Sequence, residues 1–326
     1  MGLRRDNDNE GWARREALFR WLTSQAVVRV DGAVLSWHNP AHPGFPYPEA
    51  AALWLSWAAW RHARREPTPE VDQITLVAAR LSRELLEQGG IGVRGSNYLF
   101  DTCLALDALA RTELSGPPGT KERDQALAVA SGRLSRWVDE PAPVVPMPRD
   151  PDRWSRRWDA HLLRASGILG RAARILDRAD LLDISRCLVE RIPGRGAIEA
   201  PDYLHARCYA LEGRWMLEGA IPDVEEAIAA LAEHQQEDGS LPARAGEPGD
   251  GRSDATAQAV RLWCASNPDA FARRIRRGIS WLLDQTDPSD GIRYEAGSED
   301  LNTWAALFTD QALAWATDGE SDGAWI

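Results

Sequence analysis

The sequence places side chains that can donate or accept protons in the first turns of several predicted helices. Asp101 and Asp254 are carboxyls, and His161 and His205 are imidazoles. A carboxyl kept neutral by its surroundings can protonate a substrate, and a histidine titrates near neutral pH and suits proton transfer. We expect acid–base chemistry where these helix starts meet. The alternative for each side chain alone is a helix cap or a satisfied polar group of the core.

Aromatic and polar residues accompany these groups in the same parts of the sequence. Aromatic faces stabilise cations through their quadrupoles and also stack on sugar rings. The residues expected to line a substrate site are Trp37, His38, Tyr98, Phe100, Trp158, Asp159, Tyr203, Gln258, Trp304 and Phe308. His38 and His42 lie in a proline-containing loop for which a rigid lid is the favoured interpretation. Most other tryptophans of the fifteen are expected to pack between helices.

Helices must bring these residues together, and the chain is predicted to be all-α. Apolar residues recur at i, i+3, i+4 and i+7, and loops rich in Gly, Pro, Asp and Ser separate the runs. Six weakly polar helices are predicted to begin near Tyr47, Asn97, Arg157, Asp202, Ser253 and Asn302. A more charged helix precedes each of them, over residues 11–30, 69–88, 121–140, 171–191, 222–236 and 269–285.

The spacing of about 50 residues between these starts indicates a repeat of helical hairpins. Six pairs predict a closed (α/α)6 toroid with six inner helices covered by six outer ones, in a single domain over residues 1–326. The inner helix N-termini then converge on one rim. Their partial positive charge and free N–H groups suit an anion, a sugar or a developing oxyanion. The sequence leaves open whether residues 1–30 close the ring or lie outside it.

The composition excludes several classes of protein. The chain has 38 Lys+Arg against 49 Asp+Glu, and a net charge of -11 argues against a nucleic-acid partner. No apolar run approaches the length of a transmembrane helix, and the N-terminus lacks a signal-peptide pattern. The four cysteines form no CxxC pair, so neither a disulfide framework nor a clustered zinc site is indicated. A cytoplasmic location is expected.

No cofactor or metal is expected. Residues 90–95 match a dinucleotide-binding string, but they follow a helix instead of a strand. Asp101 with Cys103, or His205 with Cys208, offers atoms that bind zinc. Each pair lies only partly on one helix face, so the two pairs would have to meet across the ring. Zinc therefore stays a minor alternative.

Glu212 lies two helical turns beyond His205 in a predicted buried helix. A buried carboxylate needs a partner, and Arg214 or Arg261 can provide one. A structural ion pair is the favoured interpretation, and a catalytic base is the second.

Residues 277–285, Arg-Gly-Ile-Ser-Trp-Leu-Leu-Asp-Gln, with Gly291 after them, resemble the QW repeat of squalene-hopene cyclases and related terpenoid cyclases. Residues 227–239 resemble a second copy. The aromatic residue that ends the repeat is displaced to Tyr294 in one copy and replaced by Leu241 in the other. The resemblance implies an α/α toroid, a fold that these cyclases share with prenyltransferase β subunits.

Residues 252–257, Arg-Ser-Asp-Ala-Thr-Ala, resemble the Asp-x-Asp-Asp-Thr-Ala acid motif of class II terpenoid cyclases. The resemblance implies that Asp254 is the protonating acid, although Arg252 and Ala255 replace its two flanking aspartates. The equally weighted alternative is that Asp254 only caps the helix that follows it, from Ala255 to Cys264.

These observations lead to one expected function and two alternatives. The expected function is a metal-independent cyclase or isomerase that acts on an isoprenoid-like small molecule, with Asp254 as the general acid. Asp101, His161 and His205 tune this acid or take the final proton. The first alternative is a carbohydrate-active epimerase, lyase or hydrolase, because α/α toroids also serve that chemistry. The second is a non-catalytic toroid that binds a lipid or a peptide.

Overall fold

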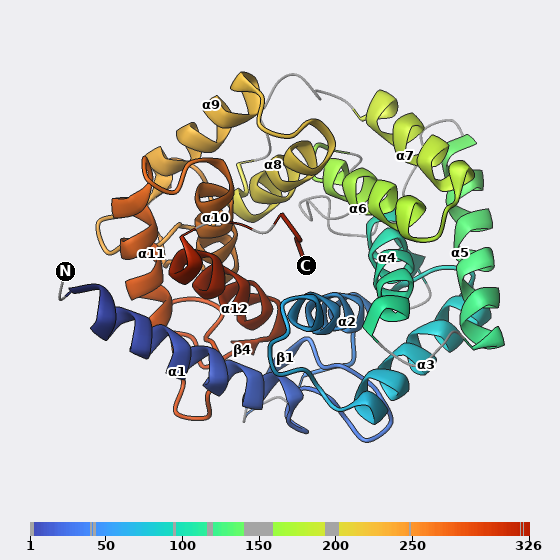
Figure 1. Cartoon of the computed structure of the whole chain (residues 1–326), viewed down its shortest axis with the longest axis horizontal. Coiled ribbons are helices and arrows are strands. Elements are labelled where there is room, and N and C mark those ends of the chain that lie inside the picture. The colour runs from blue at the N-terminus through green and yellow to red at the C-terminus, as the bar shows by residue number, and fades with distance from the viewer. Residues whose placement is uncertain are drawn as a thin grey trace.

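The computed structural model describes residues 3–39, 41, 44–93, 96–115, 120–139, 159–192, 202–247, 249–319, 321 and 323–326. Within these ranges, twelve α-helices form two concentric layers around a common axis (Figure 1). The inner helices are α2 (Pro48–Ala63), α4 (Leu99–Ser115), α6 (Leu162–Ile175), α8 (Leu204–Glu218), α10 (Ser253–Ser266) and α12 (Thr303–Asp318). The outer helices are α1 (Leu3–Thr23), α3 (Val71–Gln88), α5 (Lys121–Asp139), α7 (Ala179–Arg191), α9 (Pro222–Leu231) and α11 (Ala272–Asp284).

The two layers differ in how much of each helix surface is apolar and buried. Inner helix α2 is buried without interruption from Ala50 to Arg61. Outer helix α3 buries mainly a stripe, with Ile74, Val77 and Leu81 at spacings of one helical turn. A helix that is apolar all round fits between neighbours, whereas an amphipathic helix covers it from the solvent side. The expected (α/α)6 toroid is confirmed.

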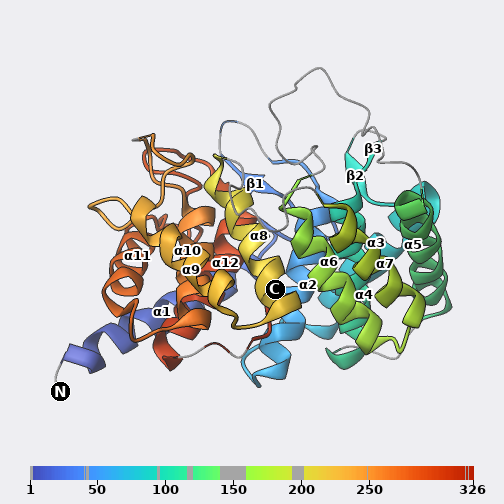
Figure 2. The same ribbon diagram turned by 90° about the horizontal axis from the view of Figure 1, so that it is seen from above.

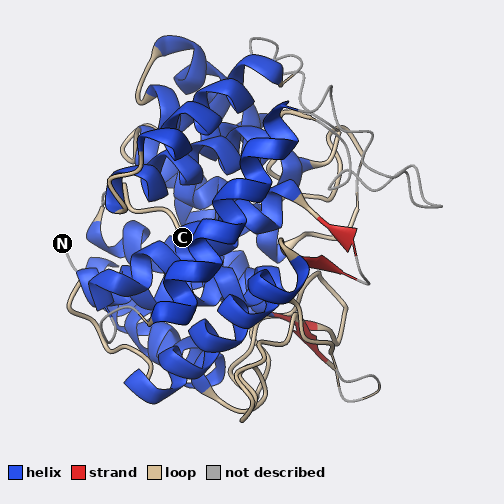
Figure 3. Cartoon of the chain, turned by 90° about the vertical axis from the view of Figure 1, so that its right-hand side faces the viewer, coloured by secondary structure: helices blue, strands red, loops and turns tan. Residues whose placement is uncertain are grey.

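The ring closes where the last inner helix, α12, meets the first, α2. Each inner helix contacts the next one, and α12 contacts α2. Strand β1 (Trp37–His38) pairs antiparallel with β4 (Leu301–Asn302) at this junction. A second short hairpin, β2 (Gly92–Val93) with β3 (Ser96–Asn97), precedes α4. These strands lie at the end of the toroid where the inner helices begin, which we call the mouth (Figures 2 and 3).

Helix α1 belongs to the outer layer and packs against α12. Its position is held by buried Asp310 of α12, which accepts hydrogen bonds from Arg15 Nε at 2.9 Å and Arg61 Nη1 at 2.6 Å. Trp57 Nε1 of α2 also donates to this carboxylate at 2.7 Å. Burial alone would raise the pKa of Asp310, but Arg15 and Arg61 hold it below its ordinary value. The network joins α1, α2 and α12 through one ionised carboxylate.

Several helix boundaries differ from those predicted, and three of them show why. Helix α1 ends at Thr23 instead of residue 30, because Val28 pairs with Val34 in a β-bridge. Helix α6 runs through Arg171 to Ile175, and the chain reverses at Asp177, which has a φ of 51°. Helix α9 ends at Leu231 and continues as a short 3-10 helix over residues 232–234.

The C-terminal residues lie on the axis of the ring (Figure 1). Trp325 and Ile326 are each only 1% exposed. Arg111 Nη1 and Arg171 Nη1 donate to the Trp325 carbonyl at 3.1 and 2.5 Å. The C-terminal residues are therefore part of the core. In the described parts of the chain, no helix combines the length and hydropathy that crossing a membrane requires.

Candidate active site at the mouth of the toroid

The inner helix starts bring most of the expected site residues into a continuous chain of contacts. The Tyr47 hydroxyl, just before α2, donates to Asp101 Oδ2 of α4 at 2.9 Å. The neighbouring Phe100 ring lies 6.0 Å from the His161 ring, at the start of α6. The Phe100 ring also lies 5.1 Å from the Tyr209 ring, which lies 4.5 Å from the ring of His205 on α8. Four inner helices thus meet along one half of the mouth.

The second half of the chain of contacts begins at His205. Its Nδ1 lies 3.4 Å from Asp254 Oδ2, which also accepts a hydrogen bond from Arg252 Nη2 at 2.9 Å. Arg252 Nη1 donates to the Tyr203 hydroxyl at 2.9 Å, and Arg252 also donates to the hydroxyl of Tyr294. These contacts join α8, α10 and the loop before α12.

Aromatic residues complete the circle between α10 and α2. The Tyr294 ring lies 5.8 Å from Trp37, which lies 6.0 Å from Trp304. Trp304 lies 5.7 Å from Tyr47, where the chain of contacts began. Phe45, 6.1 Å from Trp37, extends this aromatic wall toward solvent. Phe45, Tyr47 and Tyr294 were not predicted as members of the wall: Phe45 and Tyr294 lie in loops, and Tyr47 was predicted only as a helix start.

Asp101 is the best-placed acid at the mouth. Only 4% of its surface is exposed. Burial raises the pKa of Asp101 to about 7, although the hydrogen bond from Tyr47 works in the opposite direction. Glu49, in the first turn of α2, is half-buried beside it. Burial raises the pKa of Glu49 well above its ordinary value, and the charge of Asp101 adds to this effect.

Glu49 was not identified from the sequence. The available signal was an acidic residue directly after Pro48 in the first turn of a helix. A favourable interaction with the helix dipole explains that pattern equally well. Only the fold shows that the first turn of α2 lies beside Asp101.

Asp254 has the opposite electrostatic character. Burial alone would raise its pKa, but Arg252, His205 and the Ala255 backbone N–H hold the pKa of Asp254 below its ordinary value. It is therefore a carboxylate, whereas protonating an alkene requires a neutral acid. The helix begins one residue earlier than the capping alternative supposed, with Arg252 as its N-cap, although Asp254 Oδ1 accepts a hydrogen bond from the Ala255 N–H at 2.8 Å in the first turn.

Both histidines of the mouth are neutral near neutral pH. Burial lowers the pKa of His161 to about 3. Burial lowers the pKa of His205 to about 4, although the Asp254 carboxylate opposes the shift. A neutral imidazole carries one N–H donor and one acceptor nitrogen. His161 and His205 therefore suit hydrogen bonds to a substrate better than proton donation.

The remaining predicted site residues lie at different depths. Tyr98 and Asp159 are half-buried next to the starts of α4 and α6. Gln258 and Phe308 are fully buried, one or more turns below the mouth. His38, in strand β1, lines a hollow together with Arg20 and Trp21 of α1. Trp158, like His42 of the predicted lid, lies outside the described residues.

Below the mouth, Glu212 forms the buried ion pair that was expected. Arg261 of α10 pairs with Glu212 Oε1, and Arg164 of α6 pairs with Oε2. Arg261 is therefore confirmed as a partner. Arg214 is not a partner, because it bonds Glu218 on its own helix at 2.6 Å.

The described residues include no cluster of three or more His, Cys, Asp or Glu side chains arranged to hold a metal ion. Zinc binds cysteine as the thiolate. Burial raises the pKa of Cys208 to about 12, and burial also raises the pKa of Cys103. Both thiols therefore keep their protons.

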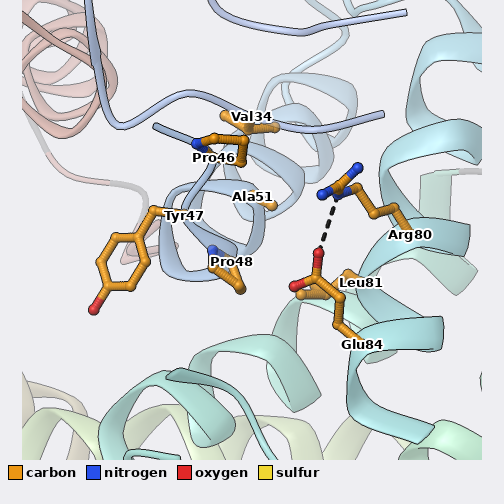
Figure 4. A pocket seen from close by; sticks show the side chains of 8 residues that line it. All are labelled: Val34, Pro46, Tyr47, Pro48, Ala51, Arg80, Leu81 and Glu84. Atoms are coloured by element: carbon orange, nitrogen blue, oxygen red, sulfur yellow. Dashed lines mark hydrogen bonds and ion pairs between the residues drawn. The ribbon is translucent and has the colours of Figure 1, made fainter. Parts of the chain in front are cut away.

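A small crevice lies between α2 and α3, beside Tyr47 at the start of α2 (Figure 4). Its volume of about 10 Å³ leaves room for about one water molecule. The Arg80–Glu84 pair, at 3.0 Å, lines one side. The Tyr47 ring points away from this pair (Figure 4). The crevice therefore does not compete with the mouth as a substrate site.

Comparison with known proteins shows similarity only in structure. No protein-family model matches the chain, and no relative is found among curated proteins. An unsaturated glucuronyl hydrolase specific for heparin superposes with a TM-score of 0.69 at 10% identity, covering 95% of this chain and 98% of that one. The unsaturated glucuronyl hydrolase of Bacillus sp. GL1 gives 0.65 at 11%, covering 94% and 96%. A glycosidase in complex with glucose gives 0.64 at 12%, covering 97% and 98%.

The shared fold is the α/α toroid. This agrees with the fold that the QW-like segments implied, but it gives no support to membership of the squalene-hopene cyclases. In the toroid, these segments have a structural role. Gln235 Nε2 donates to the carbonyls of Gly239 and Arg274, each at 2.9 Å. Gly239 has a φ of 103° and lies against the Arg277 backbone, where a Cβ would clash.

Proposed function

We propose that the chain is a carbohydrate-active hydrolase that uses Asp101 as its general acid. The observation that carries the proposal is the environment of Asp101. It is a buried carboxyl with a pKa of about 7, behind a partly exposed wall formed by Trp37, Tyr47 and Trp304. A carboxyl of this kind is protonated often enough at neutral pH to donate to a leaving group. Aromatic faces of this kind stack on sugar rings.

The reaction needs one proton donor and a return path for the proton. Asp101 gives its proton to the oxygen of the breaking C–O bond, and water adds to the carbon that the leaving group departs from. The proton that this water releases returns to the Asp101 carboxylate, so Asp101 ends as it began. The neutral imidazoles of His161 and His205 position hydroxyl groups or the water by hydrogen bonds.

An acidic sugar is the substrate class that we propose to test first. Arg252 lies at the mouth beside the aromatic wall and bonds two tyrosine hydroxyls there. Its positive charge attracts a carboxylate, although its Nη2 is already bonded to Asp254. The names of two similar structures, both unsaturated glucuronyl hydrolases, support the same class.

The test compares Asp101→Asn with Asp254→Asn, two changes of one carboxylate to an amide of the same size. The probes are an unsaturated glucuronyl disaccharide and a set of neutral nitrophenyl glycosides. We expect Asp101→Asn to lower kcat/KM by at least about 100-fold, since a general acid contributes that much. Asp254→Asn should lower it less, because Asp254 acts through His205 and Arg252. Full activity of Asp101→Asn would refute the assignment.

A further inference from the structure

Residues 324–326 lie on the axis of the toroid, and side chains of the inner helices bind their backbone (Figure 1). Arg171 of α6 donates to the Trp325 carbonyl, and Arg164 of the same helix donates to the Ile326 carbonyl. These two arginines are seven residues apart, which is about 10 Å along a helix. Arg164 lies in the first turn of α6, next to the mouth, so it can link this segment to the site.

The segment has specific partners for its ring and its backbone. The Trp325 ring lies edge-on to Trp315 at 4.9 Å, and the Arg261 guanidinium lies 5.4 Å from the Trp325 ring centre. Gln311 Nε2 of α12 donates to the Ala324 carbonyl at 2.9 Å. The segment is therefore bound on the axis as a peptide ligand would be, by side chains of several helices.

Arg164 connects the segment to the residues of the mouth through Tyr209. The Arg164 guanidinium lies 4.8 Å from the centre of the Tyr209 ring. Tyr209 is 1% exposed, and its ring lies 4.5 Å from the ring of His205 and 5.1 Å from that of Phe100. Phe100 directly precedes Asp101 in the first turn of α4. A movement of the Tyr209 ring would thus reach both sides of the mouth.

The orientation of the Arg164 guanidinium depends on its two acceptors. Arg164 is fully buried, and it pairs with Glu212 through Nη1 and with the Ile326 carbonyl through Nη2. A guanidinium is a rigid planar fork, so acceptors at two of its nitrogens fix the plane of the group. A buried charged donor that loses its acceptor is costly and turns toward another one. Loss of the Ile326 carbonyl should therefore change how Arg164 lies against Tyr209.

From these contacts we propose that residues 324–326 are an internal ligand of the toroid that positions the site at its mouth. The segment fixes Arg164, and Arg164 fixes the Tyr209 ring. Tyr209 in turn holds His205 and the helix start that carries Asp101. Arg164 is thus a positioning residue that acts through Tyr209. The effect on catalysis rests on the proposed function, in which Asp101 is the acid.

NMR of histidine side chains tests this coupling without any substrate. Deletion of Ile326 removes the acceptor of Arg164 and should shift the imidazole resonance of His205. Ile326→Ala is the matched control, because it removes most of the side chain and keeps the carbonyl, so the His205 resonance should stay in place. His38 of β1, outside these contacts, serves as the reference in the same spectra.

Arg164→Lys is the second variant, and it keeps Ile326 and the positive charge. Lysine lacks the planar fork, so it cannot hold both acceptors in the same geometry. The His205 resonance should shift in this variant as well. A His205 resonance that stays at its wild-type position in the folded variants would overturn the proposal.

Kinetics with the unsaturated glucuronyl disaccharide give a separate readout. Deletion of Ile326 should lower kcat by about tenfold, since a small misplacement of catalytic groups costs that much or more. Ile326→Ala should keep most of the activity. Wild-type kcat after the deletion would contradict a positioning role. The expected His205 shift, in a protein that hydrolyses no glycoside even as the wild type, would refute the hydrolase and leave the coupling standing.

Discussion

Replacing Glu212 by glutamine should destabilise the toroid more than any other single-atom change near the site. Glu212 lies between Arg164 and Arg261, and all three side chains are 0% exposed. The three residues come from α6, α8 and α10. Burial lowers the pKa of Arg164 and of Arg261 to about 9, so their positive charge is disfavoured there from the outset. Glu212 supplies the negative charge that balances them.

Removing one partner of a buried ion pair costs about 3–5 kcal/mol, because an uncompensated charge stays in the core. Here two arginines lose their counter-ion. Each keeps one other acceptor: the Ile326 carbonyl for Arg164, and Gln311 Oε1 at 2.8 Å for Arg261. The amide oxygen of the new glutamine can also accept a hydrogen bond. We therefore expect a loss of about 3 kcal/mol in the free energy of unfolding, the lower end of the range.

Denaturant unfolding followed by circular dichroism measures this loss. The matched control is Glu218→Gln on the same helix, where the carboxylate is 34% exposed and pairs with Arg214 at 2.6 Å. An exposed pair of this spacing contributes about 0.5 kcal/mol or less. If Glu212→Gln costs no more than Glu218→Gln, the reasoning about the buried charges is wrong.

Four further predictions concern pH, backbone strain and the aromatic wall. The pKa of Asp310 is depressed in the folded state, so this carboxylate stabilises the fold above the ordinary carboxyl pKa and loses that effect as pH falls. Asp310→Asn should therefore make the Tm less dependent on pH on the acid side of a thermal-unfolding series. The pKa of Asp101 is raised in the folded state, so the wild type loses stability as pH rises from about 4 to about 7. In the same series, Asp101→Asn should be more stable than the wild type above pH 7. Gly239→Ala should lower the free energy of unfolding by about 1–3 kcal/mol, and by more than Gly246→Ala, which also has a positive φ but has nothing within 4 Å of its Cβ. Trp304→Ala should raise KM for the glycoside probes more than Trp304→Phe does, because only the alanine removes the stacking face.

The repeat of apolar helices made the toroid predictable, because the apolar residues of α2 and α10 occur on all sides of the helix and indicate burial on all sides. The polar residues at helix starts were also identifiable, since a closed ring must gather its inner N-termini at one end. Their protonation states were not. Asp101 and Asp254 occupy similar positions in their helices, and only the neighbours distinguish them: Arg252 beside Asp254, and Tyr47 and Glu49 beside Asp101.

Most of the other site residues that the sequence did not reveal lie in loops. Tyr294 and Phe45 reach the mouth from segments whose paths depend on the pairing of β1 with β4 and on isolated β-bridges. Such pairings join residues far apart in the chain, so local patterns do not reveal them.

The most direct measurement is whether the wild-type protein releases reducing sugar from an unsaturated glucuronyl disaccharide or from any neutral nitrophenyl glycoside. A matched set of isoprenoid alcohols and diphosphates is assayed in parallel. We expect the wild type to release sugar, Asp101→Asn to release less, and none of the isoprenoids to be converted. Conversion of an isoprenoid that depends on Asp254, with every glycoside left intact, would contradict this expectation.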